Sequence, residues 1–260
     1  MSEAEMTFWD HLDDLRRVLF RVFIVVAVLG VGAFTAMPWI FQNVIMAPCN
    51  PGFPTYRIFD SIAGTTTADG FNVDVVSLEL ASQFFVHMSA SCWVAFVVGF
   101  PIIIYLLWGF IAPGLYEHER CGVTKAFIFG NIMFYLGMAV GYYLVFPLAV
   151  RFLADYRLSE AIRPVVSLDS YMDNFFTILL MMGAVFELPL LAWILGKMGM
   201  LTRGFFSRYR RHAIVVLLII AALITPTGDP FTLFLVFIPI YALWEASARL
   251  VPAATTENHD

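Results

Sequence analysis

Stretches without a single charged side chain occupy most of this 260-residue chain. A helix of about 20 apolar residues crosses a bilayer, so stretches of this kind predict membrane spans. The pattern therefore predicts an all-α, polytopic membrane protein with six transmembrane helices, folded as one integral membrane domain over residues 1–260. We expect the spans at about residues 20–41, 84–112, 124–150, 174–197, 212–227 and 230–249.

The last two spans are expected to be short. Ala213–Thr225 lies between His212 and a turn that runs from Pro226 to Pro230 and includes Asp229, to which we assign a structural role. At about 1.5 Å per residue this run reaches roughly 20 Å, less than the roughly 30 Å of a hydrocarbon core. We expect either a locally thinner bilayer or longer neighbouring helices that shelter the pair.

An amphipathic helix is predicted at the membrane surface over residues 7–21, before the first span. Its apolar face and its polar face each repeat at helical spacing. The apolar face carries Phe8, Leu12, Leu15 and Leu19, and the polar face carries Asp10, Asp14, Arg17 and Arg21. Asp14 is therefore expected at the interface. The alternative to a functional role is an ordinary solvated face, in which Asp14 pairs with Arg17 and contributes only tenths of a kcal/mol.

The basic residues that flank the spans predict that both termini lie in the cytoplasm. With the N-terminus inside, eleven of the 15 Lys and Arg residues flank inner ends of spans, and four lie outside. The outer four are Arg57, Arg151, Arg157 and Arg163. Segment 42–83 then lies outside, and its prolines predict an extracytoplasmic cap built of short helices.

Composition agrees with a membrane protein and excludes several other classes. Hydrophobic residues make up 60% of the chain and charged residues 13%. The net charge is −5, and the sequence has no basic face that would follow a nucleic acid backbone. Cys49, Cys92 and Cys121 are expected at different depths, which argues against a disulfide. No catalytic, phosphate-binding or metal-binding motif is present, so we expect no enzyme activity, no cofactor and no metal. His87 is expected to make an ordinary polar contact.

Glu187 is the strongest intramembrane signal, because it interrupts the fourth span near its middle. An ionised group at that depth costs about 3 kcal/mol or more, so it should face the protein interior, a cavity or a partner. Pro189 frees a backbone carbonyl and is expected to bend the helix there. Gln83 and Glu245 are weaker signals of the same kind, and an i,i+4 pair with Arg249 explains Glu245 equally well. A proton-coupled secondary transporter that uses Glu187 is the alternative function.

Carboxylates also gather where the second span meets water. Pro113 and Gly114 end the helix, and Glu117 and Glu119 follow on a short, shaped connection that the predicted topology places in the cytoplasm. A structural scaffold would need none of these carboxylates. They are therefore the centre of our functional interpretation.

Several motifs, in this order along the chain, resemble those of the TatC family, the multispanning receptor of the twin-arginine protein translocase. The resemblance covers about 230 residues, and the motif around Glu119 is specific. The motifs are His11-Leu12-Asp13-Asp14-Leu15-Arg16, Ala47-Pro48, Phe110-Ile111-Ala112-Pro113-Gly114-Leu115-Tyr116-Glu117-His118-Glu119-Arg120, Phe146-Pro147, Phe186-Glu187-Leu188-Pro189 and Thr225-Pro226-x-x-Asp229.

The resemblance implies a six-helix protein of a prokaryotic cytoplasmic membrane that binds twin-arginine signal peptides of folded cargo. It also implies single-span TatA and TatB partners, a homo-oligomer within the receptor complex and export driven by the proton-motive force. By position, Asp14 and Glu119 would contact the peptide and Phe110 and Pro113 would shape that site, while Pro48 would support the outer cap and Glu187 would be the intramembrane carboxylate. We assign Glu117, two residues before Glu119, to the same peptide-binding site. The family usually has Glu at position 14, so Asp13 is a candidate to share that contact.

Carboxylates suit such a ligand on chemical grounds as well. A guanidinium group prefers a fixed carboxylate that accepts two parallel hydrogen bonds, and Asp14 with Glu119 supplies two such carboxylates. Each charge-assisted bond contributes on the order of 1.5–3 kcal/mol, less where water screens it, which suits reversible recognition.

Overall fold

Five helical segments of the described chain are long and apolar enough to cross a membrane. They are Leu12–Phe59, Ser82–Phe110, Phe127–Ala154, Leu168–Lys197 and Pro230–Leu250. The fifth predicted span, over 212–227, corresponds to α9 (Arg210–Ile224), which has 15 residues and is short, as expected. Its neighbour α10 (Pro230–Leu250) has 21 residues, so the shortness belongs to α9 alone. The all-α membrane class is confirmed.

The computed structural model describes residues 8–63, 73–111, 117–156, 159, 165–197, 199–225 and 228–251. Within these ranges, only the backbone is described for residues 8–11, 60, 62–63, 111, 117–126 and 155. The chain divides into two compact units. Unit 1 contains residues 1–41 and 83–131, and unit 2 contains residues 42–82 and 132–260. The single membrane domain expected over residues 1–260 stays a prediction.

Unit 1 begins with one long helix, α1 (Phe8–Ile40), which has 33 residues. The sequence predicted two elements here, a surface helix over 7–21 and a span over 20–41, and that division is wrong. Neither proline nor glycine stands near the expected junction at Arg21, so nothing interrupts the backbone hydrogen bonds. Only after Pro38 does the helix give way, to a π-helical turn, η1 (Phe41–Ile45).

The helix α3 (Ser82–Ile111) packs along α1 in the antiparallel sense. The ring of His87 stacks on Phe34 with centroids 4.0 Å apart. A methyl carbon added to Gly99 would lie 3.0 Å from the Leu29 side chain, and one added to Gly30 would lie 3.9 Å from Ala95. Residue numbers thus fall along α3 as they rise along α1, and the small residues allow the close approach typical of membrane helices.

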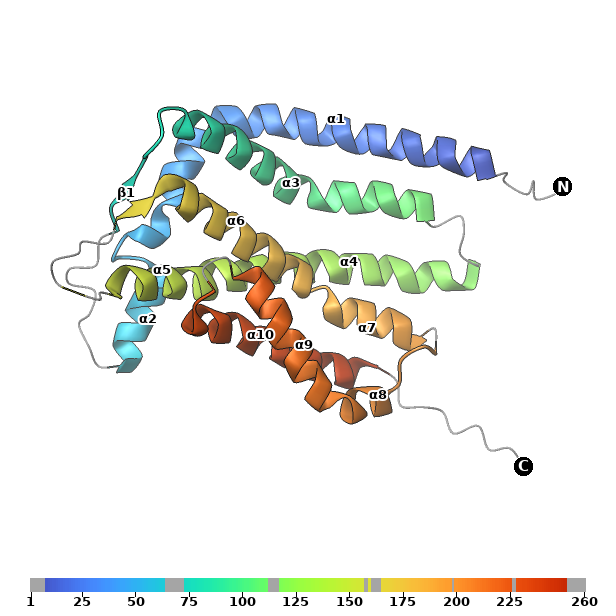
Figure 1. Cartoon of the computed structure of the whole chain (residues 1–260). Helices are drawn as coiled ribbons and strands as arrows, with labels where there is room; N and C mark the ends of the chain where they lie inside the picture. Colours follow the sequence, from blue (N-terminus) through green and yellow to red (C-terminus); the bar gives the residue numbers. More distant parts are fainter. Residues whose placement is uncertain are drawn as a thin grey trace. The chain divides into compact units, whose positions relative to one another are not determined.

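The first part of α4 (Glu117–Val140) completes unit 1. Tyr105 of α3 meets Phe127 of α4 edge to face, with ring centroids 6.3 Å apart. The C-terminal end of α3 at Ile111 and the N-terminal end of α4 at Glu117 both lie at the end of unit 1 where α1 begins (Figure 1).

Unit 2 begins with the segment predicted as a cap. Its short elements are η1, the 3₁₀ turn η2 (Ala47–Cys49), α2 (Pro54–Ala63) and β1 (Val75–Val76). The strand β1 pairs in parallel with β2 (Val166–Ser167), Val75 opposite Val166. Short helices over 42–63 agree with the expected kind of structure, and their extracytoplasmic location stays a prediction.

Buried tyrosines fasten this segment to the helices of unit 2. The hydroxyl of Tyr56 lies 2.8 Å from the carbonyl oxygen of Pro48 and 3.1 Å from that of Pro147, and the hydroxyl of Tyr171 donates to the carbonyl of Ile45 at 2.5 Å. Each tyrosine is at most 2% exposed, so these bonds satisfy hydroxyl groups that are buried away from water.

The helical core of unit 2 contains two irregular places. The helix α4 passes through a π-helical turn, η4 (Gly141–Val145), into α5 (Phe146–Asp155), and the apolar segment Phe127–Ala154 agrees with the span predicted over 124–150. The predicted span 174–197 consists of α6 (Leu168–Val185) and α7 (Leu188–Lys197), separated by Phe186 and Glu187 (Figure 1). The bend expected from Pro189 is therefore present as a break two residues before it.

Three further helices complete unit 2: α8 (Arg203–Arg208), α9 and α10. Asp229 is the N-cap of α10, and its Oδ1 accepts a hydrogen bond from the backbone N–H of Thr232 at 2.7 Å. Such a cap satisfies an amide that the helix itself leaves free. The C-terminal end of α10 packs on α7 and α8 around buried Ala192, Phe206 and Val251.

Candidate functional site

Asp14 and Phe110, two of the predicted peptide-binding residues, lie at the same end of unit 1. Asp14 precedes Leu29 by 15 residues and Phe110 follows Gly99 by 11, and Leu29 and Gly99 are in contact. At about 1.5 Å per residue they lie about 22 Å and about 17 Å beyond that contact, within about one helical turn of each other along the axis. Residues nearly 100 positions apart in sequence thus reach one level of the unit.

The start of α4 reaches the same level. From the contact between Tyr105 and Phe127, Phe110 lies five residues along α3 and Glu119 eight residues back along α4, or about 8 Å and about 12 Å. Glu117 and Glu119 stand in the first turn of α4, where the partial positive charge of the helix N-terminus favours carboxylates. Pro113 and the side chains of Glu117 and Glu119 lie outside the described part of the structure.

Asp14 makes the local pair that the sequence offered as the alternative to function. Arg17 Nη1 lies 3.5 Å from Asp14 Oδ1, and the two side chains are 70% and 47% exposed. A long, exposed pair of this kind contributes at most about 1 kcal/mol. Since the pair is weak, it leaves the Asp14 carboxylate open to exchange for a better guanidinium partner. Phe110 is half-buried in the last turn of α3.

Glu187 occupies the break between α6 and α7. Its backbone N–H donates to the carbonyl of Ala184 at 3.1 Å, three residues back, and its carbonyl accepts from Leu191 N–H at 3.0 Å at the start of the next helix. The side chain is half-buried, and no hydrogen bond or ion pair joins its carboxylate to any side chain in the described ranges. Pro189, buried in the first turn of α7, supplies no N–H to the carbonyl of Val185.

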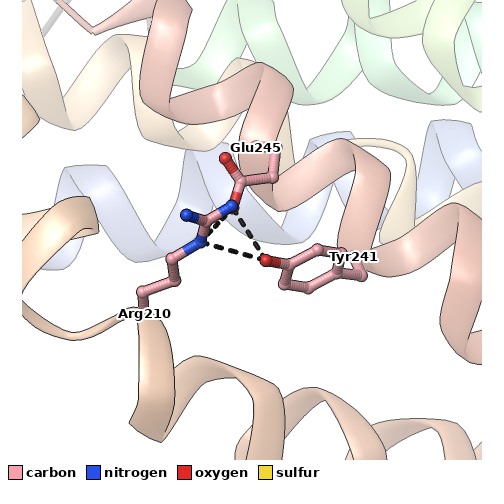
Figure 2. A network of polar contacts seen from close by, with 3 residues as sticks. All are labelled: Arg210, Tyr241 and Glu245. Carbon is pink, nitrogen blue, oxygen red and sulfur yellow. Dashed lines mark hydrogen bonds and ion pairs between the residues drawn. The ribbon is translucent and has the colours of Figure 1, made fainter.

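Glu245 has a different partner from the one that sequence spacing suggested. Its Oε1 lies 2.8 Å from Nε of Arg210 at the start of α9, not beside Arg249 in its own helix. The hydroxyl of Tyr241 donates to the same Oε1 at 2.9 Å and accepts from Arg210 Nε at 3.0 Å (Figure 2). The hydrogen bond to Tyr241 and then the charge of Glu245 raise the pKa of Arg210 above its usual value. The i,i+4 pair with Arg249 was therefore wrong, because a partner on the neighbouring helix is closer.

The remaining predicted residues have simpler surroundings. Gln83 is exposed in the first turn of α3, and His87 Nε2 lies 3.0 Å from the carbonyl oxygen of Phe34, which agrees with the polar contact expected of it. Pro48 is buried in η2, where its carbonyl meets Tyr56. Within the described ranges, no cluster of three His, Cys, Asp or Glu residues is arranged to hold a metal ion.

Sequence patterns missed Arg210 and Tyr241 as parts of a site. The spacing of Tyr241 was the one available signal, since Tyr241 lies four residues before Glu245 on the same face of α10. Arg210 gave none, because its role depends on how α9 and α10 pack.

These features define a class: a multi-pass α-helical protein of the inner membrane, with Asp14, Phe110 and the start of α4 at one end of unit 1 and Glu187 at a helix break in unit 2. The chain belongs to the family described as Sec-independent protein translocase protein (TatC), whose profile matches residues 10–239. It is thus a component of a protein translocase, with a role in transport.

Individual relatives and solved structures agree with this family. The chain is 34% identical to the TatC protein of Deinococcus radiodurans over 247 residues, which cover 95% of this chain and 86% of that one. It is 32% identical to the TatC protein of Koribacter versatilis, with 92% and 82% covered. A crystal structure described as the twin-arginine translocase receptor TatC in DDM superposes with a TM-score of 0.74 at 27% identity, covering 93% of this chain and 99% of the other.

Proposed function

We propose that this chain binds the twin-arginine signal peptides of folded cargo through Asp14, Phe110 and the start of α4 around Glu119, with Pro113 and Glu117 shaping the same surface. The observation that supports the proposal is the antiparallel register of α1 and α3, which brings Asp14 to the level of Phe110 and of the start of α4. In the sequence, Asp14, Phe110 and Glu119 belong to three separate helices, so their common level follows only from the packing.

The chemistry of this surface suits a pair of guanidinium groups. Two carboxylates at one level of unit 1 can each accept parallel hydrogen bonds from one arginine, which a lysine cannot reproduce. At on the order of 1.5–3 kcal/mol for each charge-assisted bond, less the cost of displacing water, binding is selective and reversible. Phe110 adds an apolar contact beside the charged groups.

The same proposal includes the partners of the complex. We infer that the chain organises single-span TatA and TatB proteins and other copies of itself, and that the proton-motive force drives export. The support is the family and the similarity to a solved protein described as a receptor. Family membership also favours this function over a proton-coupled transporter built on Glu187.

Titration of the purified protein with a fluorescent twin-arginine peptide tests the proposal, with a twin-lysine peptide as the ligand control. Glu119→Gln keeps the shape of the side chain and removes its charge, so we expect affinity to fall by tenfold to a hundredfold, equivalent to about 1.4–2.7 kcal/mol. Glu79→Gln makes the same chemical change at an exposed position of unit 2 and should bind like the wild type. Wild-type affinity in Glu119→Gln would exclude charge pairing at this position.

A further inference from the structure

The carboxylate of Glu187 stands at a helix break, and breaks in membrane helices need support from neighbours. The residue before it, Phe186, is 6% exposed and packs on α4. The contacts between α4 and α6 therefore decide where the break lies. They involve three glycines, Gly137, Gly141 and Gly183, which we call the glycine interlock.

Gly137 permits the closest approach. A methyl carbon added there would lie 2.5 Å from the carbonyl oxygen of Met182 and 2.7 Å from Cβ of Phe186. Real Cβ atoms do not approach other atoms so closely, and a backbone oxygen cannot move aside as a flexible side chain can. That same oxygen accepts the N–H of Phe186 at 3.1 Å, the last regular hydrogen bond before the break.

The other two glycines extend this contact on both sides. A methyl carbon on Gly141 would lie 3.3 Å from the Met182 side chain, and one on Gly183 would lie 2.8 Å from the ring of Phe134. Gly137 and Gly141 are four residues apart and share one face of the helix, with Phe134 preceding them on that face. Each helix thus inserts a large side chain opposite a glycine of the other.

This packing leaves the α6 backbone no freedom along α4. Met182 is fully buried, Phe134 is 2% exposed, and both fill the space that the glycines leave. Beyond Phe186 the chain turns within three residues, since Glu187 N–H bonds to Ala184. The position of Glu187 then follows from the position of Phe186.

We propose that Gly137, Gly141 and Gly183 are positioning residues for Glu187, and that the interlock holds the α6–α7 break at the place where the carboxylate acts in export. The export half of this inference rests on the proposed function, whereas the positional half concerns the protein alone. The two halves can therefore be measured separately.

Pulsed EPR measures the position. Spin labels at Asp173 and Leu191, which are exposed near the two ends of the α6–α7 segment, report the bend in a protein whose three native cysteines are replaced. We expect one narrow distance distribution in the parent protein, and a shifted or broadened one in Gly137→Ala and Gly183→Ala. Gly32→Ala is the matched control, since nothing lies within 4 Å of a methyl carbon there.

A second variant separates positioning from general loss of structure. Phe134→Leu removes the ring Cε2 that a methyl group at position 183 would approach to 2.8 Å, and the other near side chain, Met138 with its Cγ at 3.1 Å, is flexible. The double variant Phe134→Leu/Gly183→Ala should therefore recover the parent distance distribution. Export in vesicles should follow the same order: reduced at least tenfold in Gly183→Ala, and within about threefold of wild type in Phe134→Leu, in the double variant and in Gly32→Ala.

Twin-arginine peptide affinity is measured on the same samples and should not change in any of them. An unchanged EPR distance in both Gly137→Ala and Gly183→Ala would overturn the interlock, and so would a double variant as displaced as Gly183→Ala. A displaced break with normal export would overturn the link to Glu187. Failure of the wild type to bind the peptide would instead refute the proposed function and leave the EPR result to decide the positional half.

Discussion

Asp14 is one methylene shorter than the glutamate usual in the family, and the structure shows it already engaged in its own helix. The pair with Arg17 is 3.5 Å long and largely exposed. A longer carboxylate reaches further from the helix, whereas a cation repels guanidinium groups. We expect Asp14→Glu to bind the twin-arginine peptide as well as the wild type and Asp14→Lys to lose at least tenfold in affinity. Equal affinity of the two variants would show that this part of α1 does not contact the peptide and only anchors the protein at the membrane surface.

Arg17 competes with the peptide for Asp14. An exposed pair contributes about 0.2–1 kcal/mol, and that amount must be given up when a peptide arginine takes its place. Arg17→Gln should therefore tighten peptide binding about two- to threefold at low salt, and the gain should shrink as salt rises. Isothermal titration at two salt concentrations checks this. Arg16→Gln removes the same charge from an exposed neighbour and is the control, and an equal gain there would point to net charge and not to competition.

The helices α9 and α10 are joined by the Arg210–Tyr241–Glu245 network of Figure 2. Tyr241→Phe removes a hydroxyl that donates to one partner and accepts from the other, and leaves the ion pair intact. One such hydrogen bond contributes about 0.5–1.5 kcal/mol, so the melting temperature in detergent should fall by about 2–4 °C. Tyr209→Phe, at an exposed ring in the turn before α9, should change it by less than about 1 °C. Equal shifts would mean that the network adds nothing to stability.

How far elements follow from sequence depends on whether the determining contact is local. The charge-free runs predicted α3 and α10 to within two residues, because burial of a continuous apolar helix in lipid is a local property. The division of α1 was wrong for a local reason, since a change from amphipathic to apolar composition does not break a helix. Pro189 predicted a bend in this segment, and the structure has a helix break at Phe186 and Glu187.

Contacts between helices could not be derived in the same way. The pairing of Glu245 with Arg210 depends on the packing of α10 against α9, and the local i,i+4 rule pointed to Arg249. Likewise, Tyr56 and Tyr171 bond to carbonyls whose positions depend on the whole of unit 2. Asp14 and Glu119 were assigned to one surface from topology and family resemblance, and only the register of α1 on α3 gives that surface a physical basis.

At the scale of the whole molecule, the proposed roles fall into different units. Asp14, Phe110 and Glu119 belong to unit 1, whereas Glu187 and the glycine interlock belong to unit 2. Peptide recognition and the intramembrane carboxylate are thus built from separate sets of contacts. Substitutions in one set should leave the other intact, which makes recognition and a later step of export separable by mutation.

Glu187 offers the direct test of this separation. Its carboxylate has no side-chain partner in the described ranges. The free-energy cost of placing it in apolar surroundings must be offset by water, by a polar group of a partner helix or by the inserted signal peptide. We expect Glu187→Ala to bind the twin-arginine peptide with wild-type affinity and to export cargo at least tenfold more slowly. Glu187→Gln should do less harm, because an amide can replace a protonated carboxyl as a hydrogen-bonding group.

Peptide affinity and cargo export, measured side by side on Glu187→Ala, Glu187→Gln and Glu119→Gln, decide the matter. Glu119→Gln should lose both binding and export, because a cargo that is not recognised cannot proceed to any later step. Glu187→Ala should lose export alone, since the half-buried carboxylate belongs to a unit that contributes none of the proposed peptide contacts. Loss of binding in Glu187→Ala as complete as in Glu119→Gln would show that the two sites act as one. Normal export in Glu187→Ala would show instead that the helix break is needed for the fold and its carboxylate is not needed for transport.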